Sequence, residues 1–255
     1  MQKKDKTRII VLAGGKGTRM KSELPKALLP LRGKPMIKHL LKSIKKSRID
    51  KKPVIVIGYG KDLVKKELGD KYQYAVQEEQ LGTGHALMIA EKVIGSDCDF
   101  VLVLAADQPL VSKETLERII KKQKEKNPTV MIATVIVPDF EGWRHGLYTD
   151  FGRIVRENNG RIKKIVEFRD SNEKQKKIKE LNLAIYAFQA EWLKNNINKL
   201  KNENDQKEYY LTDLVKMAFE QNEPIESVEV KNTIEALHPN SKETLEILEK
   251  LAPEN

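Results

Sequence analysis

VLAGGKGTRMKSELPKALLPLRGKPM, residues 11–36, decides the fold, because it follows a strand-like hydrophobic run with a glycine-rich, positively charged loop. Its 26 residues include four glycines, three prolines and six lysines or arginines. In open α/β sheets, a glycine-rich turn after a buried strand binds phosphate through bare backbone N–H groups and a helix N-terminus. The stretch therefore predicts an anion-binding loop after the first strand.

Two common phosphate-binding patterns do not fit this loop. The dinucleotide fingerprint G-x-G-x-x-G fails, because Gly15-Lys16-Gly17-Thr18-Arg19 is followed by Met20. The Walker pattern needs G-K-[ST] after a six-residue glycine spacing, which GGKGTRMK does not supply. The loop brings its own cations, Lys16, Arg19 and Lys26, and these suit a polyphosphate better than a dinucleotide bridge.

Four continuous apolar runs rich in β-branched residues predict parallel strands that are covered on both faces. These runs are RIIVLAG, PVIVIG, FVLVLAAD and VMIATVIV. Helical patterns lie between them, with apolar stripes over residues 36–44 and 86–93 and a third helix expected to begin after Ser112 as N-cap. Because strand and helix alternate, we expect a doubly wound, Rossmann-like, mostly parallel α/β sheet.

The pattern changes after about residue 140. In FGRIVRENNGRIKKIVEFRD, Asn159-Gly160 separates two strand-like runs, which is a strong signal for an antiparallel hairpin. We expect one domain, with a nucleotide-binding part over residues 7–138, a small antiparallel lobe over 139–232 and a C-terminal helix over 241–251.

Charge and composition limit the class of partner. The net charge of +10 favours anionic partners, but only 6% of the residues are aromatic and the lysines are mixed with glutamates. We therefore expect no nucleic-acid partner. There is neither an apolar run long enough to span a membrane nor a signal-peptide pattern, so we expect a cytoplasmic protein without a membrane partner. The single Cys98 excludes an intramolecular disulfide.

Five sequence blocks carry a resemblance to a known family. They are LAGGKGTRMKSELPKALLPLRGKPM, QEEQLGTGHAL, FGRIVREN, IVEFRD and NENDQKEYYLTDLV, which together extend over most of residues 8–235. In this order they resemble sugar-1-phosphate nucleotidyltransferases, and among these the N-acetylglucosamine-1-phosphate uridylyltransferase domain that makes UDP-N-acetylglucosamine. The resemblance implies the nucleotidyltransferase fold, with a sugar-binding lobe.

The family resemblance also implies a reaction. A phosphate oxygen of the sugar 1-phosphate attacks the α-phosphorus of UTP, pyrophosphate leaves, and Mg²⁺ neutralises the crowded charge. No protein nucleophile is required, so catalysis depends on positioning and on electrostatic stabilisation of the transferring phosphate. The expected partners are small molecules, UTP and a sugar 1-phosphate.

By the resemblance, Arg19 holds the leaving pyrophosphate and Lys26 contacts the phosphate under attack. Gln77 and Gly82 match positions that read the uracil edge, while Thr83 has a second interpretation as the N-cap of the following helix. The full set of expected nucleotide-binding residues is Leu12, Ala13, Gly14, Gly15, Gln77, Gly82 and Thr83.

Asp107 follows the apolar run VLVLAA, at the expected carboxyl end of a central strand. The resemblance implies that Asp107 is a magnesium ligand and that Asn232, in VEVKNTIEAL, is the second, although a simple turn role for Asn232 is an alternative. On the sugar side, Gly152, Glu167 and Asn182 match positions that bind N-acetylglucosamine in the family.

The chain departs from the family pattern near the expected sugar site. Leu183-Ala184 follow Asn182 where the family usually has Thr-Gly, Ala105-Ala106 precede Asp107 where the family has glycine before the aspartate, and PDFEGWRHGLYTD is an extra stretch. These departures leave the sugar open. Transfer to another sugar 1-phosphate or to a molybdopterin-type acceptor, which AADQPL resembles, and non-catalytic nucleotide binding remain alternatives.

Bifunctional members of the family continue into hexapeptide repeats that form a trimeric acetyltransferase β-helix. This sequence ends soon after SKETLEILEKL and carries no such repeats. We therefore expect no acetyl transfer, and a monomer or a weak homo-oligomer.

Overall fold

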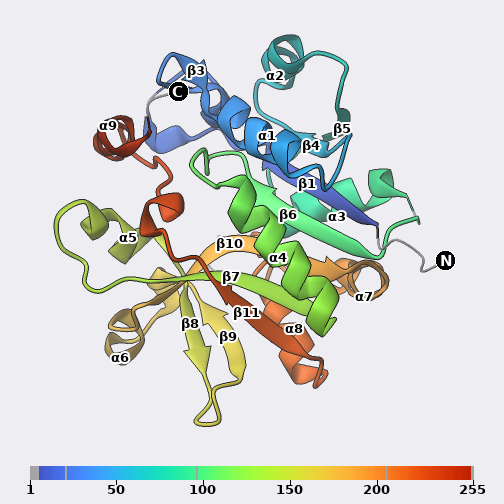
Figure 1. The fold of residues 1–255 in the computed structure, drawn as a ribbon, viewed down its shortest axis with the longest axis vertical. Helices are drawn as coiled ribbons and strands as arrows, with labels where there is room; N and C mark the ends of the chain where they lie inside the picture. Colours follow the sequence, from blue (N-terminus) through green and yellow to red (C-terminus); the bar gives the residue numbers. More distant parts are fainter. Residues whose placement is uncertain (1–5, 21, 96, 205, 254–255) are drawn as a thin grey trace.

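A mostly parallel sheet forms the centre of the protein in the computed structural model, which describes residues 6–20, 22–95, 97–204 and 206–253 (Figure 1). Within these residues the main sheet has nine strands, of which seven follow the order β11-β7-β10-β6-β1-β4-β5. Their bounds are β1 (Thr7–Ala13), β4 (Val54–Ile57), β5 (Gln73–Val76), β6 (Phe100–Ala105), β7 (Val130–Ile136), β10 (Glu180–Gln189) and β11 (Ile225–Glu229).

The strand pairing confirms the predicted sheet type. β1 pairs in parallel with β4 and β6, β4 with β5, and β11 with β7. β10 is the exception, since it runs antiparallel to both β6 and β7. Strands β1, β4 and β6 are almost wholly buried, as their unbroken apolar runs predicted.

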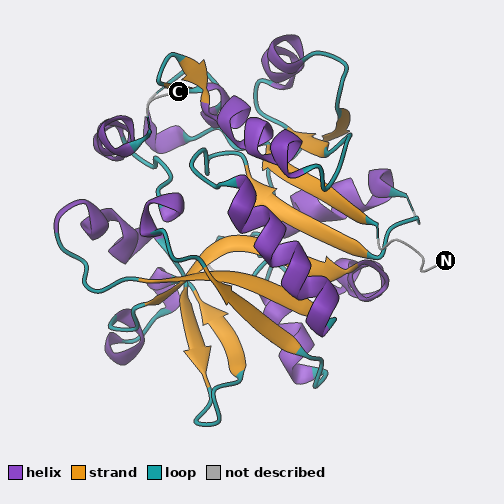
Figure 2. Cartoon of the chain, viewed as in Figure 1, coloured by secondary structure: helices purple, strands orange, loops and turns teal. Residues whose placement is uncertain are grey.

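Helices cover both faces of the sheet (Figure 2). One core layer includes residues of α1 (Met36–Ser47), α2 (Lys61–Leu68), α4 (Lys113–Lys126) and α9 (Lys242–Leu251), and the other includes residues of α3 (Thr83–Ile94), α7 (Ala190–Asn196) and α8 (Asp213–Glu220). As predicted, Ser112 caps α4 by accepting a hydrogen bond from the backbone N of Thr115 at 3.1 Å. The expected doubly wound α/β architecture is confirmed.

The antiparallel lobe extends the main sheet. β8 (Arg153–Arg156) and β9 (Ile162–Val166) form a hairpin, and β8 joins β10 where Arg153 faces Leu181. Gly160 has a φ of +85°, so the turn uses a left-handed conformation that glycine adopts without a Cβ clash. The helices α5 (His145–Asp150) and α6 (Glu173–Lys176) flank this lobe, and β2 (Pro30–Leu31) and β3 (Lys34–Pro35) make a separate two-stranded sheet.

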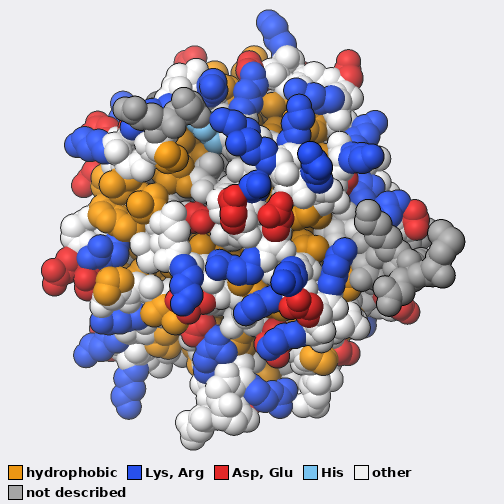
Figure 3. Space-filling view, viewed as in Figure 1, with side chains coloured by type: hydrophobic (Ala, Val, Ile, Leu, Met, Phe, Trp, Pro, Cys, Tyr) orange, Lys and Arg blue, Asp and Glu red, His pale blue; other side chains and the backbone are white. Residues whose placement is uncertain are grey.

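Basic side chains are widely distributed on the surface. On the face that carries α1 and α4, Lys and Arg side chains alternate with acidic and hydrophobic ones (Figure 3). Among the helices that the structure describes, none has the length and apolar character needed to cross a membrane.

Candidate active site

Two adjoining cavities lie at the carboxyl ends of the parallel strands. The larger one, of about 390 Å³, is lined by the glycine-rich loop after β1, by the loop after β5 and by Asp107 after β6. The smaller one, of about 220 Å³, extends from Asp107 toward β8, β9 and β10. Leu12, Thr83, Ala105 and Asp107 line both, so the two cavities meet above the ends of β1 and β6. Ligands of open α/β sheets bind at this edge.

The glycine-rich loop brings Lys26 into the larger cavity. Gly17 has a φ of +68°, and a Cβ built on it would lie 2.9 Å from Cβ of Lys26. Glycine at position 17 therefore leaves room for the Lys26 side chain to pass. The backbone N of Lys26 donates to the carbonyl of Gly15 at 3.4 Å, which closes the loop on itself.

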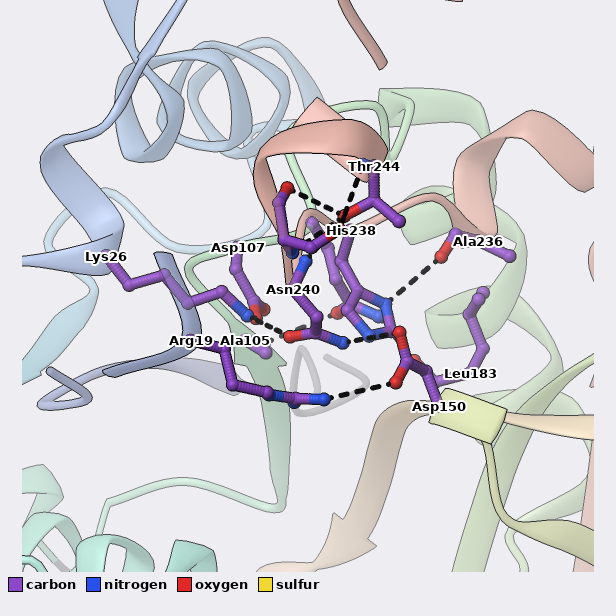
Figure 4. A network of polar contacts seen from close by, with 12 residues as sticks. Arg19, Lys26, Ala105, Asp107, Asp150, Leu183, Ala236, His238, Asn240 and Thr244 are labelled. Atoms are coloured by element: carbon purple, nitrogen blue, oxygen red, sulfur yellow. Dashed lines mark hydrogen bonds and ion pairs between the residues drawn. The ribbon is translucent and has the colours of Figure 1, made fainter. Parts of the chain in front are cut away.

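Lys26 connects two oxygen-bearing side chains from distant parts of the chain (Figure 4). Its ammonium forms an ion pair with Asp107 and donates to Oδ1 of Asn240 at 2.6 Å. Burial alone would raise the pKa of Asp107, but the opposing charge and hydrogen bond of Lys26 hold that pKa below its usual value. The Asp107 side chain is therefore a carboxylate that faces a cation.

Asn240, rather than Asn232, is the asparagine that the structure brings to Asp107. Asn232 is exposed, and its Oδ1 accepts a hydrogen bond from the backbone N of Ile234 at 3.3 Å, so it caps a short 3₁₀ turn over Thr233–Ala236. The sequence prediction is corrected here, because this turn inserts extra chain between β11 and the site. Asn240 immediately precedes Ser241, whose capping box begins α9 and was the available sequence signal.

Arg19 lies at the mouth of the same cavity. Its side chain is 64% exposed, and its Nη1 contacts Oδ1 of Asp150 at 3.3 Å. The other oxygen of Asp150 accepts a hydrogen bond from Nδ2 of Asn240 at 2.9 Å. Sequence reasoning missed Asp150, which closes a chain of contacts from Arg19 through Asn240 and Lys26 to Asp107 (Figure 4).

The loop after β5 forms the opposite wall of the larger cavity. Gln77 is buried, and its Nε2 donates to the carbonyl of Gly82 at 3.1 Å. Gly82 has a φ of +100°, and a Cβ built there would lie 2.7 Å from the carbonyl O of Tyr209. Gly82 occupies the N-cap position of α3, while Oγ1 of Thr83 accepts from the backbone N of Leu211 at 3.2 Å. The N-cap interpretation of Thr83 is therefore wrong.

The three residues predicted for the sugar side lie together around the smaller cavity. Asn182 is buried, its Nδ2 donates to the hydroxyl of Tyr186 at 2.6 Å, and its Oδ1 accepts from the backbone N of Ala184 at 3.1 Å. A Cβ on Gly152 would lie 2.8 Å from Cγ2 of Ile165. Burial raises the pKa of Glu167, although a hydrogen bond to Thr212 counteracts part of that shift.

Comparisons with known proteins identify the family of the chain. A family described as nucleotidyl transferase matches residues 8–234. The chain belongs to this family. It is 39% identical, over 94% of its length, to the bifunctional protein GlmU of Bacillus licheniformis, and 36% identical, over 98%, to that of Bacillus subtilis. It spans about half the length of these relatives, 51% and 53%.

The fold of this nucleotidyl transferase is also found in a solved structure. A Bacillus anthracis protein described as a candidate glucose-1-phosphate thymidylyltransferase, crystallised with sucrose, superposes with a TM-score of 0.74. The match covers 96% of this chain and 95% of the other, at 22% sequence identity. At this identity the likeness supports the fold alone.

The oxygen atoms around Lys26 suit a hard divalent cation. Asp107 supplies a carboxylate and Asn240 an amide oxygen, and both already face the positive charge of the Lys26 ammonium. Among the described residues, no cluster of three or more His, Cys, Asp or Glu side chains could hold a metal unaided. A nucleotidyl transferase does not need such a cluster, because Mg²⁺ commonly binds one or two protein oxygens together with substrate phosphates and waters.

Proposed function

We propose that this nucleotidyl transferase moves a uridylyl group from UTP to a sugar 1-phosphate, with N-acetylglucosamine 1-phosphate as the acceptor. The observation that carries the proposal is the meeting of two cavities at Asp107. One has a phosphate-binding loop and a wall of backbone and amide groups, and the other has a carboxylate and an amide suited to sugar hydroxyls. A donor and an acceptor placed in these cavities would react where the cavities join.

The larger cavity takes the nucleotide. Backbone groups of residues 12–15 would wrap the nucleotide, and the loop bearing Gln77 and Gly82 would meet the uracil edge. Gln77 is already fixed by its hydrogen bond to Gly82, so little side-chain entropy would be lost on binding. Arg19 would leave Asp150 and pair with the pyrophosphate, an exchange made easy by the exposure of the Arg19 side chain.

The smaller cavity takes the sugar. Glu167 would accept hydrogen bonds from sugar hydroxyls, and Asn182 is held in one orientation by Tyr186 and by the backbone of Ala184. Resemblance to N-acetylglucosamine-1-phosphate uridylyltransferases favours N-acetylglucosamine. Ala184 has a positive φ of +55°, a left-handed conformation that favours glycine, at the position where the family usually has glycine.

The reaction needs alignment and charge stabilisation. A phosphate oxygen of the acceptor attacks the α-phosphorus of UTP, a new P–O bond forms, and the bond to pyrophosphate breaks. Lys26 would contact the phosphate under attack and Arg19 the leaving group, so both cations would stabilise charge in the transition state. Asp107 and Asn240 would hold Mg²⁺, which when bound supplies further positive charge to the phosphates.

The decisive experiment is pyrophosphate release by the purified protein with Mg²⁺. UTP, CTP, GTP, ATP and dTTP are each tested with N-acetylglucosamine 1-phosphate and glucose 1-phosphate. We expect release with UTP and N-acetylglucosamine 1-phosphate, abolished in Asp107→Ala and unchanged in Asp62→Ala, a surface control. Preference for another nucleotide or another sugar would reject the corresponding half of the proposal, and absence of release from every pair would reject nucleotidyl transfer to these sugar phosphates.

A further inference from the structure

Asp150 joins the extra stretch of chain at residues 138–150 to the candidate metal ligand Asn240. It is the last residue of α5, and its side chain is only 13% exposed. One carboxylate oxygen contacts Nη1 of Arg19 at 3.3 Å, and the other accepts from Nδ2 of Asn240 at 2.9 Å. The close-up shows the side chains of Arg19 and Asn240 both ending at the carboxylate of Asp150 (Figure 4).

Two partners define the orientation of the Asn240 amide. The Lys26 ammonium has only donors, so the Asn240 atom that it contacts at 2.6 Å must be the amide oxygen. An ionised carboxylate has only acceptors, so the atom facing Asp150 must be the amide nitrogen. Both contacts therefore require Oδ1 of Asn240 to face the Lys26 ammonium, which also contacts Asp107.

The two partners have different fates in the proposed reaction. A cation held by Asp107 and Oδ1 of Asn240 would displace the Lys26 ammonium from both oxygens, and in the reaction Lys26 would turn toward a substrate phosphate. Asp150 would then be the remaining group that fixes the amide. Rotation of the Asn240 amide would turn Nδ2, a donor, toward the cation and leave the oxygen facing a carboxylate. Because Asn240 is only 9% exposed, water would do little to relieve this mismatch.

Asp150 is itself held in place by Arg153. The Arg153 guanidinium is buried, and it donates to the backbone carbonyls of Phe151 and, at 2.6 Å, of Tyr148, which bracket Asp150 in the chain. Its central carbon lies 5.3–5.4 Å from the centroids of the Phe140, Tyr148 and Phe168 rings. This arrangement fixes the backbone on both sides of Asp150.

We propose that Asp150 is a positioning residue that orients the amide of Asn240 so that its oxygen can bind a divalent cation with Asp107. This inference rests on the proposed function for the identity of the cation site. Hydrogen-bonded neighbours that orient metal ligands typically contribute 10- to 100-fold in metal affinity.

The test measures binding of Mn²⁺ alone, without nucleotide, from the electron paramagnetic resonance signal of the free ion. Wild type, Asp150→Ala, Asn240→Ala and the double variant form a cycle, and Asp107→Asn defines the site. We expect Asp150→Ala to weaken Mn²⁺ binding by about 10- to 100-fold in the wild-type background. It should have no further effect in the Asn240→Ala background, because its action passes through that amide.

Two further variants exclude a general structural effect. Asp150→Asn retains an oxygen that can accept from Asn240, so its Mn²⁺ affinity should stay within about threefold of wild type. A small loss is expected because a neutral acceptor replaces a charged one. Asp139→Ala removes the Arg144 ion pair in the same stretch without touching Asn240, so its affinity should not change.

The inference is overturned if wild type binds no Mn²⁺, if Asp150→Ala binds it normally, or if the losses from Asp150→Ala and Asn240→Ala add. Pyrophosphate release separates it from the proposed function. Release from UTP with normal Mn²⁺ binding by Asp150→Ala would retain the function and reject the inference. The expected cycle without release from any substrate pair would support the inference and reject the function.

Discussion

Lys26 and Asp107 form an ion pair that links the loop after β1 to the carboxyl end of β6, and the two residues are 81 positions apart in the chain. Their side chains are 15% and 22% exposed, so neither charge is well solvated. In the free protein the positive charge of Lys26 balances the negative charge of the Asp107 carboxylate. In the proposed reaction the same lysine would face phosphate.

Lys26→Met should therefore lower both stability and activity. The variant leaves Asp107 nearly buried without its cation, which we expect to cost about 1–3 kcal/mol of unfolding free energy. Mg²⁺ should recover part of that loss, because a divalent cation would restore positive charge beside Asp107. Urea unfolding with and without Mg²⁺ measures the loss of stability and its recovery, and pyrophosphate release measures the activity. Equal stability of variant and wild type without Mg²⁺ would contradict the role of the pair.

Gly82→Ala should damage the nucleotide site through a backbone clash. The new Cβ would lie 2.7 Å from the carbonyl O of Tyr209, in addition to the strain of a φ of +100°. We expect a loss of about 1–3 kcal/mol in stability and a higher KM for UTP. Gly95→Ala is the matched control, because Gly95 also has a positive φ, of +74°, but has open space around it. Equal KM values for the two variants would show that the Tyr209 contact is unimportant.

The sequence predicted the sheet, its covering helices and the glycine-rich loop after β1, because these depend on local patterns. Continuous apolar runs identify buried parallel strands, and Ser112 marks a helix start by its own hydrogen bond. The irregular strand β10, with its bulge between Asn182 and Tyr186, has no comparable local signal.

The sequence did not predict the contacts that complete the site. Asn240 lies 214 positions from Lys26, and Asp150 lies 90 positions from Asn240, so their proximity depends on the path of the whole chain. The family resemblance implies an asparagine near the end of the domain and so pointed to Asn232, but a 3₁₀ turn follows Asn232 before the chain reaches the site. Spacing along the sequence could not reveal that turn.

Replacing Asn232 or Asn240 with alanine should show which of the two asparagines contributes to Mg²⁺ binding. Asn232→Ala removes an exposed cap and should cost about 0.5–1 kcal/mol of stability, with no change in kcat or in Mg²⁺ dependence. Asn240→Ala removes the amide oxygen proposed as a Mg²⁺ ligand, so the Mg²⁺ concentration needed for half-maximal activity should rise at least about tenfold, because losing a ligand should cost no less than losing a group that orients it. A larger shift in Asn232→Ala than in Asn240→Ala would restore the original sequence prediction.

Glu167 provides a pH test of the sugar cavity. Burial raises the pKa of its carboxyl in the folded protein, so ionisation there opposes folding. The group has no effect on stability below the ordinary glutamate pKa of about 4.3, and it destabilises the fold increasingly as the pH rises from there through the folded-state pKa. Glu167→Gln removes this ionisation. The variant should therefore be more stable than wild type at pH 7, and the gain should shrink toward pH 4.

Urea unfolding of wild type and Glu167→Gln between pH 4 and pH 8 measures this difference, and Glu157→Gln, at the start of the β8–β9 turn, is the matched control on the same hairpin. Glu167→Gln should also raise the KM for the sugar 1-phosphate and leave the KM for UTP unchanged, because Glu167 lines the smaller cavity and not the larger one. Parallel stability profiles for wild type and Glu167→Gln would show that the carboxyl is well solvated. A KM change confined to UTP would place the acceptor elsewhere.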